Sequence, residues 1–394
     1  MRSRSPAAAK ELATRKKYLL AAVFLVLSLV SFVVQTEATA YIQSHLGWRK
    51  PYLMLYFTHC SLSVLWPFQV LILKARKPHI PWAPFLKAHF HSVRTTAQMI
   101  MAGTPHLSPS QAKRDPTVFM LRRVVFITAA LTVGGSTWYV AVNMTTPSDL
   151  TAIYNCSAFF AYVFSIFMLK ERMRVDKISS VVVACVGVLI VAYGDSGTAE
   201  KGQEEAAANR TLGNLIIGVG SVMYGFYEVL YKKVACPPEG VSSSRTIVFA
   251  NAVGTGLGLT TLVVLWIPIP FFHVMGWETF ELPHGQAALL VAVSVFSNAV
   301  FSGSFLVLIS LTSPVLSSVA ALLTIFLVAV VDQMLPSGKP LSGAAIVGGL
   351  TICAAFFLLA WSMWREMAED ANAVARGKED DEDWSESETE RDEA

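Results

Sequence analysis

Residues 287–335 read AALLVAVSVFSNAVFSGSFLVLISLTSPVLSSVAALLTIFLVAVVDQML. The stretch divides into two apolar blocks, 287–311 and 315–335, which are separated by a turn of threonine, serine and proline. Each block has about twenty residues, the length that an α-helix needs to cross a hydrocarbon core of ~30 Å. Asp332 is the only charged residue in the stretch. We therefore predict two consecutive transmembrane helices here.

The composition of the whole chain agrees with this prediction. Of its 394 residues, 54% are hydrophobic and 15% are charged, and the mean hydropathy is +0.50. A soluble protein carries about 25% charged residues. The composition excludes a soluble enzyme or a nucleic-acid-binding protein as the main interpretation, and it makes the lipid bilayer the surroundings of the chain.

Ten apolar blocks follow one another along the sequence, and we predict an all-α, polytopic membrane protein of ten transmembrane helices. The blocks are 18–36, 52–73, 124–144, 150–169, 178–193, 212–231, 247–268, 287–311, 315–335 and 341–364.

The distribution of lysine and arginine predicts the orientation, because cytoplasmic loops retain positive charge during insertion. With a cytosolic N-terminus (1–17), 26 of the 31 bases fall on the cytosolic side. The five others are Arg49, Lys50, Lys201, Arg210 and Lys339. An even number of helices then places both termini in the cytosol. Loop 194–211 lies outside, and there Asn209 begins a glycosylation sequon whose use stays open.

Two cytosolic segments are assigned no chemistry. Residues 74–121 form a predicted flexible basic loop, whose histidines lack the spacing of a zinc motif. Residues 366–394 hold 13 of the 28 acids against three bases, which leaves residues 1–365 with a net charge of +13. We predict that segment 365–394 is a disordered, solvated tail. No metal and no cofactor is assigned.

The two halves of the chain, 18–193 and 212–364, resemble each other weakly at an offset of 166 residues. Thr146 matches Thr312, Thr151 matches Ser317 and Phe160 matches Phe326. Each half contains five predicted helices, so the halves insert with opposite orientation. This is the inverted-repeat arrangement of many secondary transporters.

Several short motifs resemble a known family. The motifs are DLTAIYN at 149–155, LKER at 169–172, Gly-Val at 187–188, YGFY at 224–227, KPY at 50–52 and YFTH at 56–59. The first three resemble the first repeat of the drug/metabolite transporter superfamily, whose members include EamA-like proteins. The others are similar to solute carrier family 35 branch F, which includes thiamine transporters and fungal vacuolar-membrane members.

This resemblance implies a ten-helix carrier that alternates between outward-open and inward-open states. It also implies a eukaryotic endomembrane, Golgi or vacuole, in preference to the plasma membrane. The nucleotide-sugar carriers of the superfamily differ from this chain, because residues 315–319 replace their Gly-Ala-Leu-Asn-Lys run. No lysine or arginine is predicted inside the membrane to bind a diphosphate, so that substrate class is a minority interpretation.

Uncharged polar residues at helical spacing mark a candidate substrate cavity. The candidates are Gln35 on the first helix, Thr151, Asn155 and Tyr162 on the fourth, Asn298 on the eighth and Ser317 on the ninth. Each of these residues could instead only hydrogen-bond a neighbouring helix. Glu37, at the outer end of the first helix, is either a gate or a solvated cap.

Helix 212–231 carries a second group of candidates. Tyr224, Tyr227, Glu228 and Tyr231 follow one another at helical spacing. Phenol rings around one carboxylate could bind a cation by charge and by cation–π attraction. The alternative is an interfacial belt in which Glu228 pairs with Lys232, four residues on. Both interpretations stay open.

The main hypothesis is a secondary carrier for a small polar metabolite, such as the cation thiamine, coupled to a proton or a counter-substrate. A non-transporting scaffold or receptor is the alternative, whereas a membrane enzyme would need a cluster of reactive residues that the sequence does not show. Residues 254–258 (GTGLG) have the small-residue spacing of a homodimer face, or of packing inside one chain.

Overall fold

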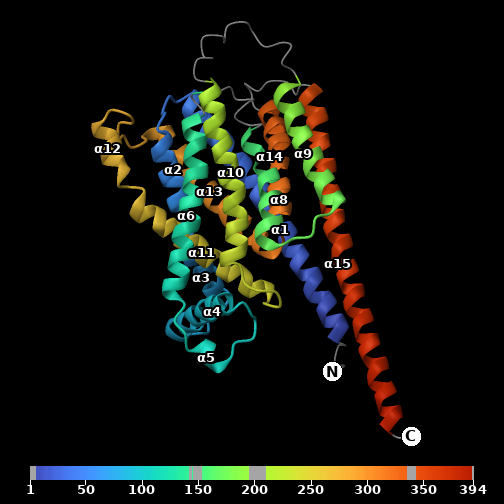
Figure 1. The fold of residues 1–394 in the computed structure, drawn as a ribbon. Coiled ribbons are helices and arrows are strands. Elements are labelled where there is room, and N and C mark those ends of the chain that lie inside the picture. Colours follow the sequence, from blue (N-terminus) through green and yellow to red (C-terminus); the bar gives the residue numbers. More distant parts are fainter. Residues whose placement is uncertain (1–5, 142–143, 145–152, 195–209, 335–342, 393–394) are drawn as a thin grey trace.

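The computed structural model describes residues 6–141, 144, 153–194, 210–334 and 343–392, and every regular element within these ranges is a helix (Figure 1). The helices of the first half are α1 (Pro6–Ser44), α2 (Pro51–Cys60), η1 (Ser61–Val64), α3 (Leu65–Ala75), α4 (Trp82–Ala102), α5 (Pro109–Ala112), α6 (Thr117–Ala141), α8 (Ser157–Phe164), η2 (Ser165–Leu169) and α9 (Val175–Tyr193). Those of the second half are α10 (Arg210–Ala235), α11 (Ser243–Val264), α12 (Pro268–Val274), α13 (Gly285–Leu311), α14 (Pro314–Met334) and α15 (Gly343–Asp392).

The all-helical class is confirmed, and each of the ten apolar blocks overlaps a helix. Among the described residues, seven helical segments are long and apolar enough to cross a membrane. Residues 153–169 and 314–328 form shorter apolar helices, and α9 has 19 residues. The number of ten spans therefore stays a prediction.

The outer surface of the bundle is apolar. Leu19, Leu215 and Phe296 are each about two-thirds exposed, at 67%, 65% and 66%. A soluble monomer rarely exposes large contiguous patches of this kind. Polar residues such as Ser294 and Ser317 are instead fully buried between helices. This distribution fits a bundle whose outside faces lipid.

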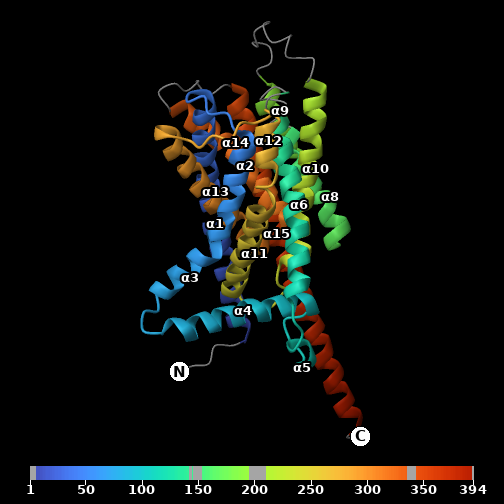
Figure 2. The same ribbon diagram turned by 90° about the vertical axis from the view of Figure 1, so that its left-hand side faces the viewer.

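The most extensive helix contacts join one half of the chain to the other. Helix α1 packs along α13, α6 packs along α10, and α9 packs along α15. Helix α11 packs across α2, η1 and α3. Figures 1 and 2 show the long helices side by side, with the beginning of α1 and the end of α15 at the same end of the bundle.

The prediction of a flexible loop over 74–121 is wrong for most of that segment. Helix α4 occupies 21 of its residues and lies across the end of the bundle (Figure 2). Arg245 of α11 fixes it by donating from Nε to Thr96 Oγ1 over 2.7 Å. Gly103, with a φ of 69°, ends the helix. The prolines of this segment suggest a loop, but Phe85, Val93 and Ala97 recur at helical spacing, which favours the helix that is observed.

The acidic segment 365–394 also differs from the prediction of disorder. Helix α15 continues through it without a break as far as Asp392. The segment has no proline and one glycine, Gly377, and alanine and glutamate have high helix propensity. Low hydrophobicity excludes a packed core for this segment, but it does not exclude a helix.

Candidate functional site

Two of the site candidates on α10, Tyr224 and Glu228, share one face of that helix with Ser221. Ser221, Tyr224 and Glu228 lie at i, i+3 and i+7, so they project to the same side. Gly225 lets α8 approach this region closely, because a Cβ there would lie 2.7 Å from the carbonyl oxygen of Ser157. The close approach brings α8 beside the polar face of α10.

Glu228 is fully buried, with 1% of its surface exposed. Its carboxylate accepts a hydrogen bond from the Ser318 hydroxyl of α14. The candidate predicted from the sequence is the neighbouring residue, Ser317, which is also buried but donates to the carbonyl oxygen of Ser313 over 3.0 Å. Successive helix residues point about 100° apart, so one residue decides which hydroxyl meets the carboxylate.

Lys232 does not pair with Glu228. Its ammonium donates to the carbonyl oxygens of Ile309, Ser310 and Thr312 over 2.9, 3.1 and 2.8 Å. These are carbonyls at the end of α13, which have no partner within their own helix. The interfacial pair of the sequence analysis is therefore not formed, and Lys232 serves instead as a C-terminal cap.

Aromatic rings lie next to the carboxylate. The Tyr224 ring is 5.5 Å from the Tyr154 ring, which lies just before α8, and 5.6 Å from the Tyr227 ring, measured between centroids. Tyr231 belongs elsewhere, because its hydroxyl lies 2.7 Å from Ser310 Oγ of α13. The structure thus groups two of the three predicted phenols, Tyr224 and Tyr227, with Tyr154.

The remaining candidates are spread over other helices. Asn298 donates from Nδ2 to the Thr58 carbonyl oxygen over 2.6 Å, which is the helix-to-helix role that the sequence analysis left open. Gln35 Oε1 and the Tyr162 hydroxyl are buried and have no hydrogen-bond partner among the described residues. Glu37 and Asn155 are half-buried. Thr151 and Asn209 lie outside the described residues.

The glycine motif at 254–258 is packed inside the monomer. A Cβ at Gly254 would lie 2.7 Å from a Leu65 methyl group, and one at Gly258 would collide with the backbone of Ser63. The two glycines therefore let α11 cross η1 and α3 closely. The homodimer prediction rests on this motif, and here the motif packs helices of one chain against each other.

A buried carboxylate, flanked by aromatic rings in a bundle of long apolar helices, is typical of polytopic helical membrane proteins that handle small solutes. Comparisons with known proteins specify this class further. Residues 80–193 match the EamA-like transporter family, which covers α4 to α9. The chain is 28% identical over 221 residues to an uncharacterized transporter of Schizosaccharomyces pombe, with 56% of this chain and 62% of that protein covered.

Two further relatives have similar coverage. An uncharacterized vacuolar membrane protein of Saccharomyces cerevisiae is 24% identical, over 63% of this chain and 62% of its own length. Solute carrier family 35 member F3 of Homo sapiens is 22% identical, over 57% of this chain and 50% of its own. The matches thus span about half to three-fifths of these relatives. The resemblance to the EamA-like superfamily and to solute carrier family 35 branch F is confirmed.

A solved crystal structure shares the fold. It superposes with a TM-score of 0.56 at 14% sequence identity, and the superposition covers 88% of this chain and 98% of that one. At this identity the likeness concerns the fold alone.

Proposed function

We propose that the protein is a secondary carrier that moves a small polar solute across a membrane by alternating access. The relatives named as a transporter and as a solute carrier support carriage over catalysis. The vacuolar relative favours an endomembrane. A scaffold without transport activity is the alternative.

The packing of the helices supports an inverted repeat of two five-helix units. In chain order, α1, α2, α6, α8 and α9 of the first half correspond to α10, α11, α13, α14 and α15 of the second. Under this correspondence, exchanging the halves turns the contact of α1 with α13 into the contact of α10 with α6, and both contacts are extensive. The same exchange turns the contact of α1 with α14 into that of α10 with α8. It maps the pairs α9–α15 and α11–α2 onto themselves. Carriers with such repeats hold substrate near the interface between them.

Buried Glu228 is the observation that carries the proposal. A carboxylate inside a membrane bundle is costly unless a partner neutralises it, and Lys232 is engaged at the end of α13. A cation between Glu228 and the neighbouring phenol rings would supply the missing charge. We therefore propose a small organic cation as the substrate, with thiamine as the first compound to test, or a coupling proton at the same carboxylate. A nucleotide sugar fits a carboxylate less well.

Uptake into proteoliposomes tests this proposal. Glu228→Gln should abolish substrate-dependent uptake while the protein still folds, because the amide keeps the shape and removes the charge. The matched control is Glu239→Gln, which neutralises an exposed carboxylate and should leave uptake unchanged. Normal uptake by well-folded Glu228→Gln protein would remove Glu228 from the site. Absence of uptake for every cation and metabolite tried with the wild type would favour the scaffold.

A further inference from the structure

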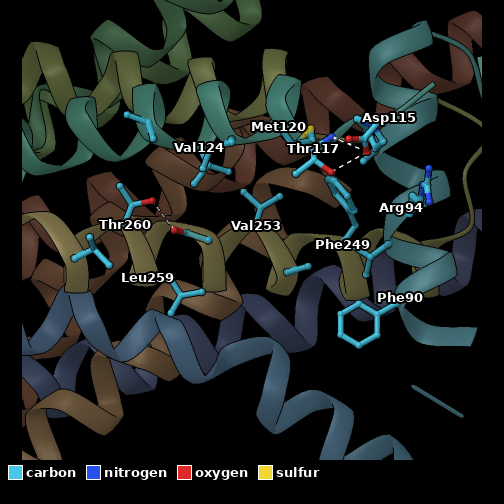
Figure 3. Close-up of a pocket in the computed structure, with 18 of the residues that line it drawn as sticks. Phe90, Arg94, Asp115, Thr117, Met120, Val124, Phe249, Val253, Leu259 and Thr260 are labelled. Atoms are coloured by element: carbon cyan, nitrogen blue, oxygen red, sulfur yellow. Dashed lines mark hydrogen bonds between the residues drawn. The ribbon is translucent and has the colours of Figure 1, made fainter. Parts of the chain in front are cut away.

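A lateral groove lies between α4, α6 and α11, and Glu228 is not among the residues that line it. Its volume is about 760 Å³. Figure 3 shows Val124 of α6 on the side of Val253 of α11, and Leu259 of α11 also lines the groove. Phe90 and Val93 of α4 close the groove at one end. The walls offer almost no hydrogen-bonding groups, because the Thr260 hydroxyl donates to the Gly256 carbonyl oxygen of its own helix over 2.9 Å.

Apart from Thr260, the polar residues of the groove gather at the end beside α4. Arg94, Asp115 and Thr117 lie there together (Figure 3). The Asp115 carboxylate already has a partner at the start of α6, because it accepts a 2.8 Å hydrogen bond from the Thr117 hydroxyl. Arg94 is exposed and forms no ion pair within the described part of the chain. The groove is apolar along its length and has the Arg94 guanidinium at one end. It is therefore complementary to an amphiphile with an anionic head.

The charge around this mouth favours an anionic head over a zwitterionic one. Residues 74–123 contain nine lysines and arginines and a single acid, Asp115. Helix α4 lies across the end of the bundle (Figure 2), at the end that also holds the beginning of α1 and the end of α15. Basic segments beside a membrane attract the anionic lipids of the cytosolic leaflet.

We propose that the groove between α6 and α11 binds one anionic glycerophospholipid, with an acyl chain against Val124 and Val253 and the phosphate on Arg94. The site is independent of the solute that the protein carries. The bound lipid would hold α4 against α6 and α11, the other two helices that line the groove.

Purified full-length protein in nanodiscs tests the proposal, with thermal unfolding as the readout. Ligands that bind the folded state raise its apparent stability. Adding dioleoylphosphatidylserine to a dioleoylphosphatidylcholine bilayer should raise the unfolding temperature of the wild type. Arg94→Gln should weaken the apparent affinity about fivefold, the size of one base's contribution to binding an anionic lipid, because Arg94 lines the groove and holds the phosphate. Lys87→Gln, which removes an exposed charge from the same helix outside the groove, should respond like the wild type.

A second variant fills the groove itself. Ala252→Phe places a ring among the lining residues and should abolish the response to phosphatidylserine, whereas Leu262→Phe, on the lipid-exposed side of α11 outside the groove, should keep it.

Equal stabilisation of Arg94→Gln and wild type by phosphatidylserine would overturn the proposal. So would a response to phosphatidylethanolamine in place of phosphatidylserine, because Arg94 and Asp115 would then each bind one charge of a zwitterionic head. Each variant is compared with its own unfolding temperature in phosphatidylcholine, so a general loss of stability does not imitate loss of binding.

Discussion

At the scale of single residues, two ionisable groups on α10 have separate partners although they are four positions apart. Glu228 meets Ser318 of α14, and Lys232 meets three carbonyl oxygens at the end of α13. Pairing with each other would have satisfied both on one helix surface. Instead, Glu228 connects α10 to α14, and Lys232 connects α10 to the end of α13.

Lys232→Met should therefore destabilise the fold. The methionine keeps most of the side-chain volume and leaves three partly buried carbonyl oxygens without their donor, at a cost of about 1–3 kcal/mol. We expect a lower unfolding temperature in detergent. The matched control is Lys233→Met at the next position, which is exposed and should change stability little. Equal stability of the two variants would show that water replaces the Lys232 ammonium.

At the scale of elements, ion pairs tie the beginning of α9 to α15. Arg174 Nη1 lies 2.8 Å from Glu369 Oε2, and Lys177 Nζ lies 2.8 Å from Glu366 Oε2. Glu171, in the segment before α9, also reaches Lys177, over 3.6 Å. These contacts come at the point where α15 leaves the bundle and continues into the acidic segment. The ion pairs therefore fix the direction in which α15 extends beyond the bundle.

The pair of Arg174 and Glu369 predicts a pH dependence. The hydrogen bond from Arg174 holds the pKa of the Glu369 carboxyl below its ordinary value of 4.5. A lowered pKa in the folded state means that the contribution to stability is present above pH 4.5 and is lost as the pH falls through the lowered pKa. The unfolding temperatures of wild type and Glu369→Gln should therefore differ at neutral pH and converge in acid. A difference that persists at low pH would exclude the ionised Glu369 carboxylate as its cause, and Glu239→Gln serves as the control.

At the scale of the whole molecule, the distribution of bases and the fold make one prediction about topology. The fold places the beginning of α1, the end of α15 and the segment holding α4 at one end of the bundle (Figure 1). Epitope tags at either terminus and between α4 and α5 should be digested together when protease is added to the cytosolic side of sealed vesicles. A tag in 195–209 should be protected. Protection of this last tag together with the termini would contradict the ten-helix topology.

Much of the fold could be predicted from the sequence because hydropathy is a local property. Twenty apolar residues favour a membrane helix whatever their neighbours are, and every apolar block found by this criterion overlaps a helix. The same criterion overlooked α4, whose apolar residues recur on one face of a helix and do not form a block. It also mistook low hydrophobicity in 365–394 for absence of structure.

The candidate site was only half determined by the sequence. The sequence by itself placed Glu228 and the tyrosines on one helix, since helical spacing is fixed by backbone geometry. Tertiary structure alone decided that Ser318 and not Ser317 meets the carboxylate, that Tyr154 joins the rings while Tyr231 leaves them, and that Lys232 caps α13. The physical reason is that a hydrogen bond between helices depends on their relative rotation and height. Those are set by the packing of segments that lie some 75 to 90 residues apart in the chain, and no local pattern records them.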